Sequence, residues 1–246
     1  MALALSAAAG FSASPALGAD YEREERWAQE VVPSIVVGDA VYLAIPSRPK
    51  VLAILTLPQG APAGGVVIVH GLGVHPDWGL IGGLRTGLAD AGYMTLAVQM
   101  PVLASGATRD DYKVTMPEAA DRIAAAVDYL RRRGSAKIAI VSHSLGASMA
   151  NQYLARSVVD AWAPIGMFGP FAVPPKEPVL DIVAETEIDP VRETRRRGHR
   201  RCRRMRAPVR SRSPAPIITS RVGRRSSSLR LARSWSGPSP SGAERA

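Results

Sequence analysis

The sequence predicts an α/β protein with a mostly parallel sheet and helices on both faces. Three observations support this fold class. Apolar runs of strand length alternate with helix-patterned segments over residues 66–184. The run at residues 138–141 is followed by Ser-His-Ser-Leu-Gly and then by small residues, which indicates strand, tight turn and helix. The β-branched run at residues 66–69 ends in His-Gly-Leu-Gly, the start of a loop.

The first half of the chain supplies a helix, a hairpin and the first parallel strands. Charged residues 21–30 predict a helix, and Gly38 then leads into apolar segments 40–45 and 51–57, which predict a hairpin. Residues 66–69 predict a strand buried on both faces. A glycine-rich helix over 81–91, a strand over 93–98 and a polar loop over 105–113 follow.

The second half continues the alternation. Thr115 and Glu118 have capping-box spacing, with proline in the first turn, and predict a helix start. This helix has apolar residues at helical spacing on one face and ends at Gly134. Further apolar runs at residues 161–168 and 178–184 predict two more strands. No strand or helix pattern follows Arg192, so the sheet is expected to lack its last strand and helix.

The basic character of the chain is confined to its C-terminal tail. The net charge is +10, but residues 192–246 contain 17 Arg, no Lys and 2 acids, a charge of +15, which leaves −5 for residues 1–191. The single cysteine, Cys202, also lies in the tail and excludes an intrachain disulfide. We therefore divide the chain into a leader at residues 1–19, a domain at 20–190 and an Arg-rich, disordered tail at 191–246.

The first 19 residues have the composition of a secretory signal peptide. They are rich in Ala and Leu, too short and weakly apolar for a transmembrane segment, and small residues surround a possible cleavage site between Ala16 and Asp20. The usual basic residue near Met1 is missing. We expect a periplasmic or secreted protein, and a cytoplasmic one if this segment is only a disordered start.

Two motifs resemble those of the alpha/beta hydrolases. The segment Ser142-His143-Ser144-Leu145-Gly146 is similar to their nucleophile elbow, Gly-x-Ser-x-Gly, with serine in place of the first glycine. The His-Gly-x-Gly loop after residues 66–69 resembles their oxyanion loop. The resemblance covers about residues 40–190, and His-Gly-Leu-Gly-Val-His-Pro-Asp-Trp is similar to an exported bacterial branch with unassigned substrates.

The resemblance implies a serine nucleophile with an oxyanion hole beside it. Ser144 would be the nucleophile, and Ser142 and Gly146 meet the need for small neighbours in the turn. The backbone N–H groups of Leu72 and Leu145 would form the oxyanion hole.

Two histidines lie in the loop that would carry one of these amides. His70 is expected to shape the loop without carrying protons. His75 could contact substrate, although a solvent-facing position is the preferred interpretation.

An orienting acid and a histidine base should follow the nucleophile in that order. Residues 178–190 resemble the strand and loop that carry the acid, with Glu187 preferred, Asp189 second, and Asp181 disfavoured because it falls inside the strand. Only His199 follows, in an arginine-rich segment with no strand before it, so it is a poor base. The triad is therefore incomplete in this chain.

Three interpretations of the tail remain open. It could be an arginine-rich arm that binds nucleic acid or anionic lipid, inert disorder, or an out-of-frame translation of a GC-rich gene. Codons that begin at the third base of the present ones convert residues 211–220 into Val-Ala-Ile-Ala-Gly-Ala-Asp-His-Tyr-Phe, if suitable wobble bases are present. This is a strand followed by Gly-x-x-His, so we prefer a frameshift that begins between Asp189 and Arg197.

The sequence predicts a serine hydrolase scaffold of the esterase or acyl-hydrolase type, for a small-molecule ester or acyl substrate. It is expected to be nearly inactive as written, and no metal or organic cofactor is implied. The alternative is a non-catalytic binding protein that recruits a polyanion through its basic tail. Substrate identity and oligomeric state stay open, and no nucleic acid is expected unless the tail is genuine.

Overall fold

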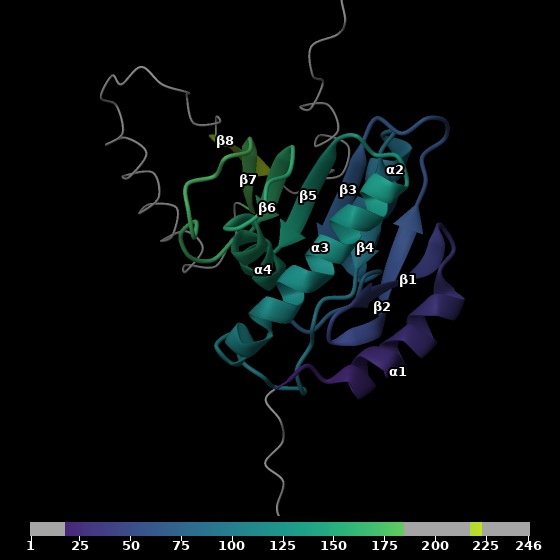
Figure 1. The fold of residues 1–246 in the computed structure, drawn as a ribbon, viewed down its shortest axis with the longest axis vertical. Helices are drawn as coiled ribbons and strands as arrows, with labels where there is room; N and C mark the ends of the chain where they lie inside the picture. The colour runs from purple at the N-terminus through teal and green to yellow at the C-terminus, as the bar shows by residue number, and fades with distance from the viewer. Residues whose placement is uncertain (1–17, 185–216, 223–246) are drawn as a thin grey trace, which may run out of the picture.

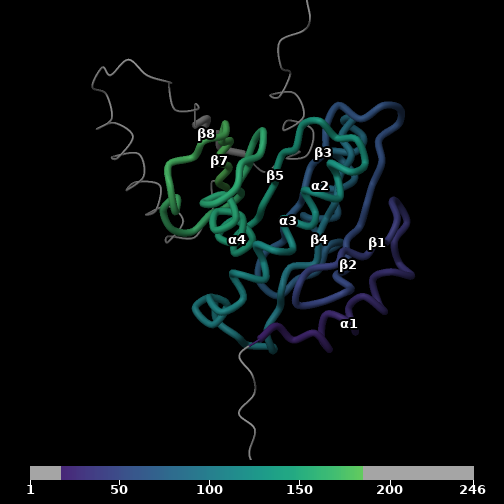
Figure 2. The backbone as a smooth tube through the Cα atoms, viewed as in Figure 1, coloured from purple at the N-terminus to yellow at the C-terminus, as the bar shows by residue number. Residues whose placement is uncertain are grey.

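The computed structural model describes residues 18–184 and 217–222 and contains one eight-stranded mixed sheet (Figures 1 and 2). The strand order is β1-β2-β4-β3-β5-β6-β7-β8. The strands are β1 Asp39–Ile45, β2 Arg48–Thr56, β3 Gly65–Val69, β4 Met94–Val98, β5 Ile138–His143, β6 Ala161–Ile165, β7 Val179–Ala184 and β8 Ile217–Val222. The α-helices are α1 Tyr21–Val31, α2 Gly79–Asp90, α3 Met116–Arg132 and α4 Leu145–Leu154, with short 3₁₀ helices η1 Val32–Ser34 and η2 Asp111–Thr115.

Sheet pairing confirms the predicted fold class. β1 and β2 form the expected antiparallel hairpin, β2 pairs antiparallel with β4, and every pair from β4 to β8 is parallel. Alternate residues of β3 enter two separate hydrophobic clusters. Val67 and Val69 pack in the cluster that contains α3 and α4, whereas Val66 and Ile68 pack with α2. Helices therefore cover both faces, and β3 is buried from both sides as predicted.

The edge of the sheet differs from the prediction. No strand was expected after Arg192, yet the backbone of β8 pairs in parallel with β7 from Val179↔Ile217 to Ala184↔Val222. The β-branched residues at the start of Ile217–Val222 favour an extended backbone, and pairing covers the otherwise free edge of β7. The leader at residues 1–17 and the remaining tail, 185–216 and 223–246, lie outside the described residues.

The helix start at α3 is not a capping box. Thr115 has a helical backbone, and its hydroxyl donates to the carbonyl oxygen of Tyr112 at 2.8 Å instead of accepting from the helix. The carboxylate of Glu118 accepts hydrogen bonds from Arg122, four residues later, and from the hydroxyl of Tyr21. The helix begins where it was predicted, but the carboxylate of Glu118 binds buried Arg122 instead of the backbone N–H that a capping box requires.

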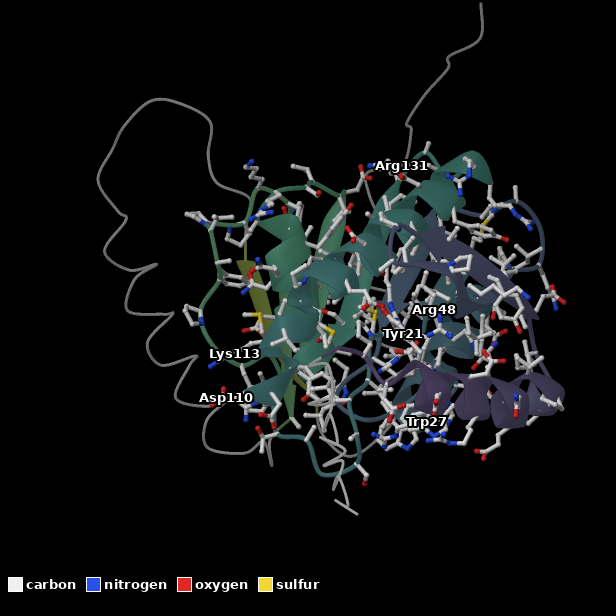
Figure 3. All side chains as sticks on the ribbon, turned by 60° about the horizontal axis from the view of Figure 1, so that its bottom comes forward. Tyr21, Trp27, Arg48, Asp110, Lys113 and Arg131 are labelled. Carbon is white, nitrogen blue, oxygen red and sulfur yellow. The ribbon has the colours of Figure 1, made fainter. Side chains whose placement is uncertain are left out.

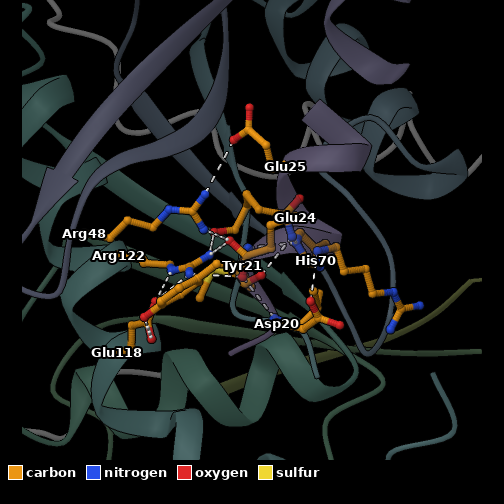
Figure 4. Close-up of polar contacts among 12 residues, drawn as sticks. Asp20, Tyr21, Glu24, Glu25, Arg48, His70, Glu118 and Arg122 are labelled. Atoms are coloured by element: carbon orange, nitrogen blue, oxygen red, sulfur yellow. Dashed lines mark hydrogen bonds and ion pairs between the residues drawn. The ribbon is translucent and has the colours of Figure 1, made fainter. Parts of the chain in front are cut away.

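α1 is attached to the domain by a buried cluster of charged residues (Figure 4). Glu24 is 4% exposed and Arg122 is fully buried, and two guanidinium nitrogens of Arg122 lie 2.9 and 3.1 Å from the two carboxylate oxygens of Glu24. Arg48 of β2 donates to the same carboxylate at 2.8 Å. Tyr21, the first residue of α1, lies close to Arg48, whereas Arg131 lies at the C-terminal end of α3 (Figure 3). The carboxylate of Glu24 thus joins α1 to β2 through Arg48 and to α3 through Arg122.

Candidate active site

The predicted nucleophile lies in a strained turn between β5 and α4. Ser144 has φ 53° and ψ −119° and is the only non-glycine residue with positive φ among the residues described. Such a backbone costs about 1–3 kcal/mol and persists only where neighbouring structure enforces it. The Ser144 N–H donates to the carbonyl oxygen of Ile165 in β6 at 2.8 Å, which holds the turn against the adjacent strand. Its side chain is half-buried at the start of α4.

The residues two before and two after Ser144 are small for different reasons. A Cβ atom on Gly146 would lie 2.8 Å from the carbonyl oxygen of Val69, and still closer to that of His70, so α4 touches the end of β3 there. Ser142 is buried, and its hydroxyl accepts a hydrogen bond from the indole N–H of Trp162 at 2.9 Å. The serine that replaces the first glycine of the family pattern therefore satisfies a buried donor on β6.

The loop after β3 lies directly against the turn. A Cβ atom on Gly71 would be 3.3 Å from Cβ of Ser144 and 3.1 Å from Nδ1 of His143. Leu72, the next residue, has an exposed side chain, whereas Leu145 is buried as the first residue of α4. The first N–H groups of a helix have no partner within the helix, and the N-terminus favours negative charge. The structure thus brings together the segments that carry Ser144, Leu72 and Leu145.

His70 is fixed between two backbone segments, as predicted for a residue that shapes the loop. Its ring is buried, and Nε2 accepts the N–H of Met100 at 2.8 Å and faces the side-chain nitrogen of Gln99 at 3.2 Å. Nδ1 therefore carries the proton and donates to the carbonyl oxygen of Gly71 at 2.9 Å. Burial lowers the pKa of His70 to about 3, with smaller contributions from His75, Arg122 and His143. The imidazole is neutral at physiological pH.

The neutral His70 should make the protein sensitive to acid. The unfolded chain binds this proton near the ordinary pKa of 6.5 and the folded chain only near 3, so lowering the pH favours unfolding across that interval. Between pH 6 and pH 4 this residue should cost about 2.5 kcal/mol of unfolding free energy. Urea unfolding at both pH values should show that extra loss in the wild type but not in His70→Asn. Equal losses in the two proteins would contradict the assignment.

His75 is not the solvent-facing loop residue that was preferred. Its ring is half-buried and packs edge-on against Trp27 of α1, with ring centroids 5.9 Å apart. Its Nδ1 accepts the N–H of Asp77 at 3.3 Å. Burial lowers the pKa of His75, while the carboxylates of Asp77 and Glu30 oppose that shift. The prediction failed because α1, which is distant in sequence, covers this loop.

The end of the same loop is fixed to α2. The guanidinium group of buried Arg85 donates to the carboxylate of Asp77, to the hydroxyl of Thr56 at 2.7 Å and to the carbonyl oxygen of Val37. Sequence reasoning missed both Arg85 and Arg122. Each is an arginine among apolar helix positions, and that is the one signal that could have revealed them.

The two preferred candidates for the orienting acid and the one candidate for the base lie in a segment that the structure does not describe. Glu187, Asp189 and His199 lie outside the described residues, and Asp181 lies within β7, as expected. Within residues 18–184 and 217–222, no group of three or more His, Cys, Asp or Glu side chains could hold a metal ion. None of the helices in this part of the chain is long and apolar enough to cross a membrane.

Comparison with known proteins supports the fold. A family described as "Protein of unknown function (DUF3530)" matches residues 53–121, and no curated protein matches the chain. Similar solved structures include a dienelactone hydrolase from Anabaena variabilis, with TM-score 0.59 and 21% identity, covering 80% of this chain and 93% of that one. A putative alpha/beta hydrolase of unknown function from Agrobacterium tumefaciens has TM-score 0.59 and 14% identity, with coverages of 75% and 84%.

A third similar structure is an alpha/beta serine hydrolase without lid from Xanthomonas campestris. It has TM-score 0.53 and 14% identity and covers 77% of this chain and 85% of that one. These neighbours show that the chain has the alpha/beta-hydrolase fold.

Proposed function

We propose that this chain is a serine hydrolase scaffold of the esterase or acyl-hydrolase type, with Ser144 as its nucleophile. The observation that carries the proposal is the positive φ of Ser144 at the start of α4, with Gly71 packed against it. A serine held in this way presents its hydroxyl clear of the sheet, at the end of a central parallel strand, where open α/β sheets place their sites.

The surrounding backbone suits acyl transfer. The Ser144 oxygen would attack the carbonyl carbon of an ester, and the N–H groups of Leu72 and Leu145 would bind the oxyanion that forms. The helix N-terminus adds a partial positive charge that favours this intermediate. The similarity to a dienelactone hydrolase and to an alpha/beta serine hydrolase supports a small-molecule ester substrate.

We further propose that the base for Ser144 is lost through a frameshift near residues 189–197. Hydrolysis requires a base to remove the hydroxyl proton, which in the alpha/beta hydrolases is a histidine, and both ring nitrogens of His70 already bind backbone groups. The orienting acid would be Glu187 or Asp189, in the segment after β7. Sequencing the gene across the codons for residues 189–220 tests the frameshift, and wobble bases that do not encode Gly-Ala-Asp-His after an apolar run in the shifted frame would reject it.

The chain as written should hydrolyse p-nitrophenyl esters hardly faster than buffer, because its nucleophile lacks a base. The measurement is initial rate against short-chain esters, with Ser144→Ala as the matched control. Robust turnover that disappears in Ser144→Ala would show that a base is present and that the predicted inactivity is wrong.

We also propose that the protein is exported, from the composition of residues 1–19. Mass spectrometry of the N-terminus in the native host would test whether this segment is cleaved.

A further inference from the structure

The buried carboxylate of Glu24 lies at one end of a continuous chain of hydrogen bonds that reaches the loop beside Ser144. The chain passes through Arg122, the Gln99–Met100 peptide and His70, and it ends at the Gly71–Leu72 peptide. The residues come from α1, α3, the end of β4 and the loop after β3, and Figure 4 shows Glu24, Arg122 and His70 close together.

The first link fixes the guanidinium group of Arg122. Both terminal nitrogens contact the Glu24 carboxylate, and the side of the group that includes Nε contacts Glu118 at 3.0 Å. One of the terminal nitrogens also donates to the carbonyl oxygen of Gln99 at 2.9 Å. A charged planar donor with this many partners has little freedom to move.

The second link is a peptide plane. The carbonyl oxygen of Gln99 accepts from Arg122, and the N–H of Met100, in the same trans peptide, points the opposite way and donates to Nε2 of His70 at 2.8 Å. The orientation of Arg122 therefore sets the direction from which His70 receives its hydrogen bond. A cation on the carbonyl oxygen also polarises the N–H and strengthens that bond.

The third link repeats this geometry on the other side of the imidazole. Nδ1–H of His70 donates to the carbonyl oxygen of Gly71 at 2.9 Å. The N–H of Leu72 belongs to the same planar peptide and points away from that oxygen. Holding the Gly71 carbonyl therefore fixes the direction of the Leu72 N–H, and Gly71 itself packs against Ser144.

We propose that Glu24 and Arg122 are positioning residues that orient and polarise the backbone N–H of Leu72 through this relay. α1 thereby becomes part of the site and not only a helix packed on the domain. Naming the Leu72 N–H an oxyanion donor rests on the proposed function. The relay itself is measured without substrate, so its failure and the failure of the hydrolase proposal are distinguishable.

The test compares Glu24→Gln with Glu25→Gln in the full ¹⁵N-labelled chain. Glu24→Gln removes the buried charge at nearly constant volume. Glu25 is the next residue of the same helix, is mostly exposed and contacts the same Arg48 at 3.8 Å, which makes it a matched control. In Glu24→Gln we expect changed chemical shifts for the Leu72 amide and the His70 ring nitrogens, and amide exchange about tenfold faster over residues 70–78. Glu25→Gln should leave these signals unchanged.

The same data separate positioning from simple destabilisation. A purely structural role would speed exchange throughout α1 and the core but leave the Leu72 and His70 shifts of the folded protein unchanged, and that result would overturn the proposal.

Two further measurements test the relay. If Glu24→Gln does not fold, Arg122→Lys keeps the charge but cannot reach Glu24, Glu118 and Gln99 together, and it should move the same signals. In the wild type, a ¹⁵N–¹⁵N coupling across the Met100–His70 hydrogen bond should be observable, and its absence in the assigned spectrum would also overturn the relay.

Discussion

Replacing Gly146 with alanine should remove a large fraction of the protein's stability. The added Cβ atom would lie 2.8 Å from the carbonyl oxygen of Val69 and closer still to that of His70, distances that real side chains do not adopt. Both oxygens are backbone atoms at the end of β3, which is paired on both sides by β4 and β5 and cannot retreat. We expect a loss of about 3–5 kcal/mol, a large fraction of the stability of an ordinary domain.

Urea unfolding followed by circular dichroism measures this loss, with Gly83→Ala as the control. Gly83 is an exposed glycine within α2, and a Cβ atom there would meet nothing within 4 Å. Alanine at this helical position should stabilise the protein by about 0.5–1 kcal/mol. If Gly146→Ala unfolds at the same urea concentration as the wild type, the close approach of α4 to β3 is not as the structure has it.

The turn around Ser144 shows how far the sequence could predict the site. The five residues from Ser142 to Gly146 were sufficient to predict strand, turn and helix, because small residues around a turn are a local requirement. The sequence could not say that Gly146 faces the end of β3 or that Ser142 satisfies the indole of Trp162, because these contacts join elements that are separated in sequence.

The errors have the same origin. Glu118 had the spacing of a capping box, but Arg122 is buried in the interior and binds its carboxylate. His75 was expected to face solvent, but Trp27 of α1 packs against its ring. Periodicity assigns an element and its buried face, whereas it carries no information about which distant helix will cover a loop. For the same reason the relay from Glu24 to Leu72 could not be inferred from spacing.

Shifting the reading frame of the tail should convert the chain into an ester hydrolase that depends on Ser144. The parallel pairing of β8 with β7 shows that the sheet has a place for a last strand beside β7, and the loops after parallel strands reach the same edge of the sheet as Ser144. In the shifted frame a strand pattern at the codons of residues 211–214 leads directly into Gly-Ala-Asp-His, so a histidine would follow a strand at that edge. A base delivered there would complete the proposed site around Ser144.

The experiment inserts one base within the codons for residues 189–197, so that each later codon begins at the third base of a present one, and measures initial rates with p-nitrophenyl esters. We expect the repaired protein to exceed the chain as written by at least about a thousandfold, because a positioned base and nucleophile act as a unit. Ser144→Ala in the repaired gene, and separately an alanine codon in place of the recovered histidine codon, should each return the rate to the starting level. A repaired, folded protein with no activity on a broad ester panel would reject the frameshift proposal, because the strained turn at Ser144 would then lack its base in either frame. Activity that survives Ser144→Ala would instead reject Ser144 as the nucleophile.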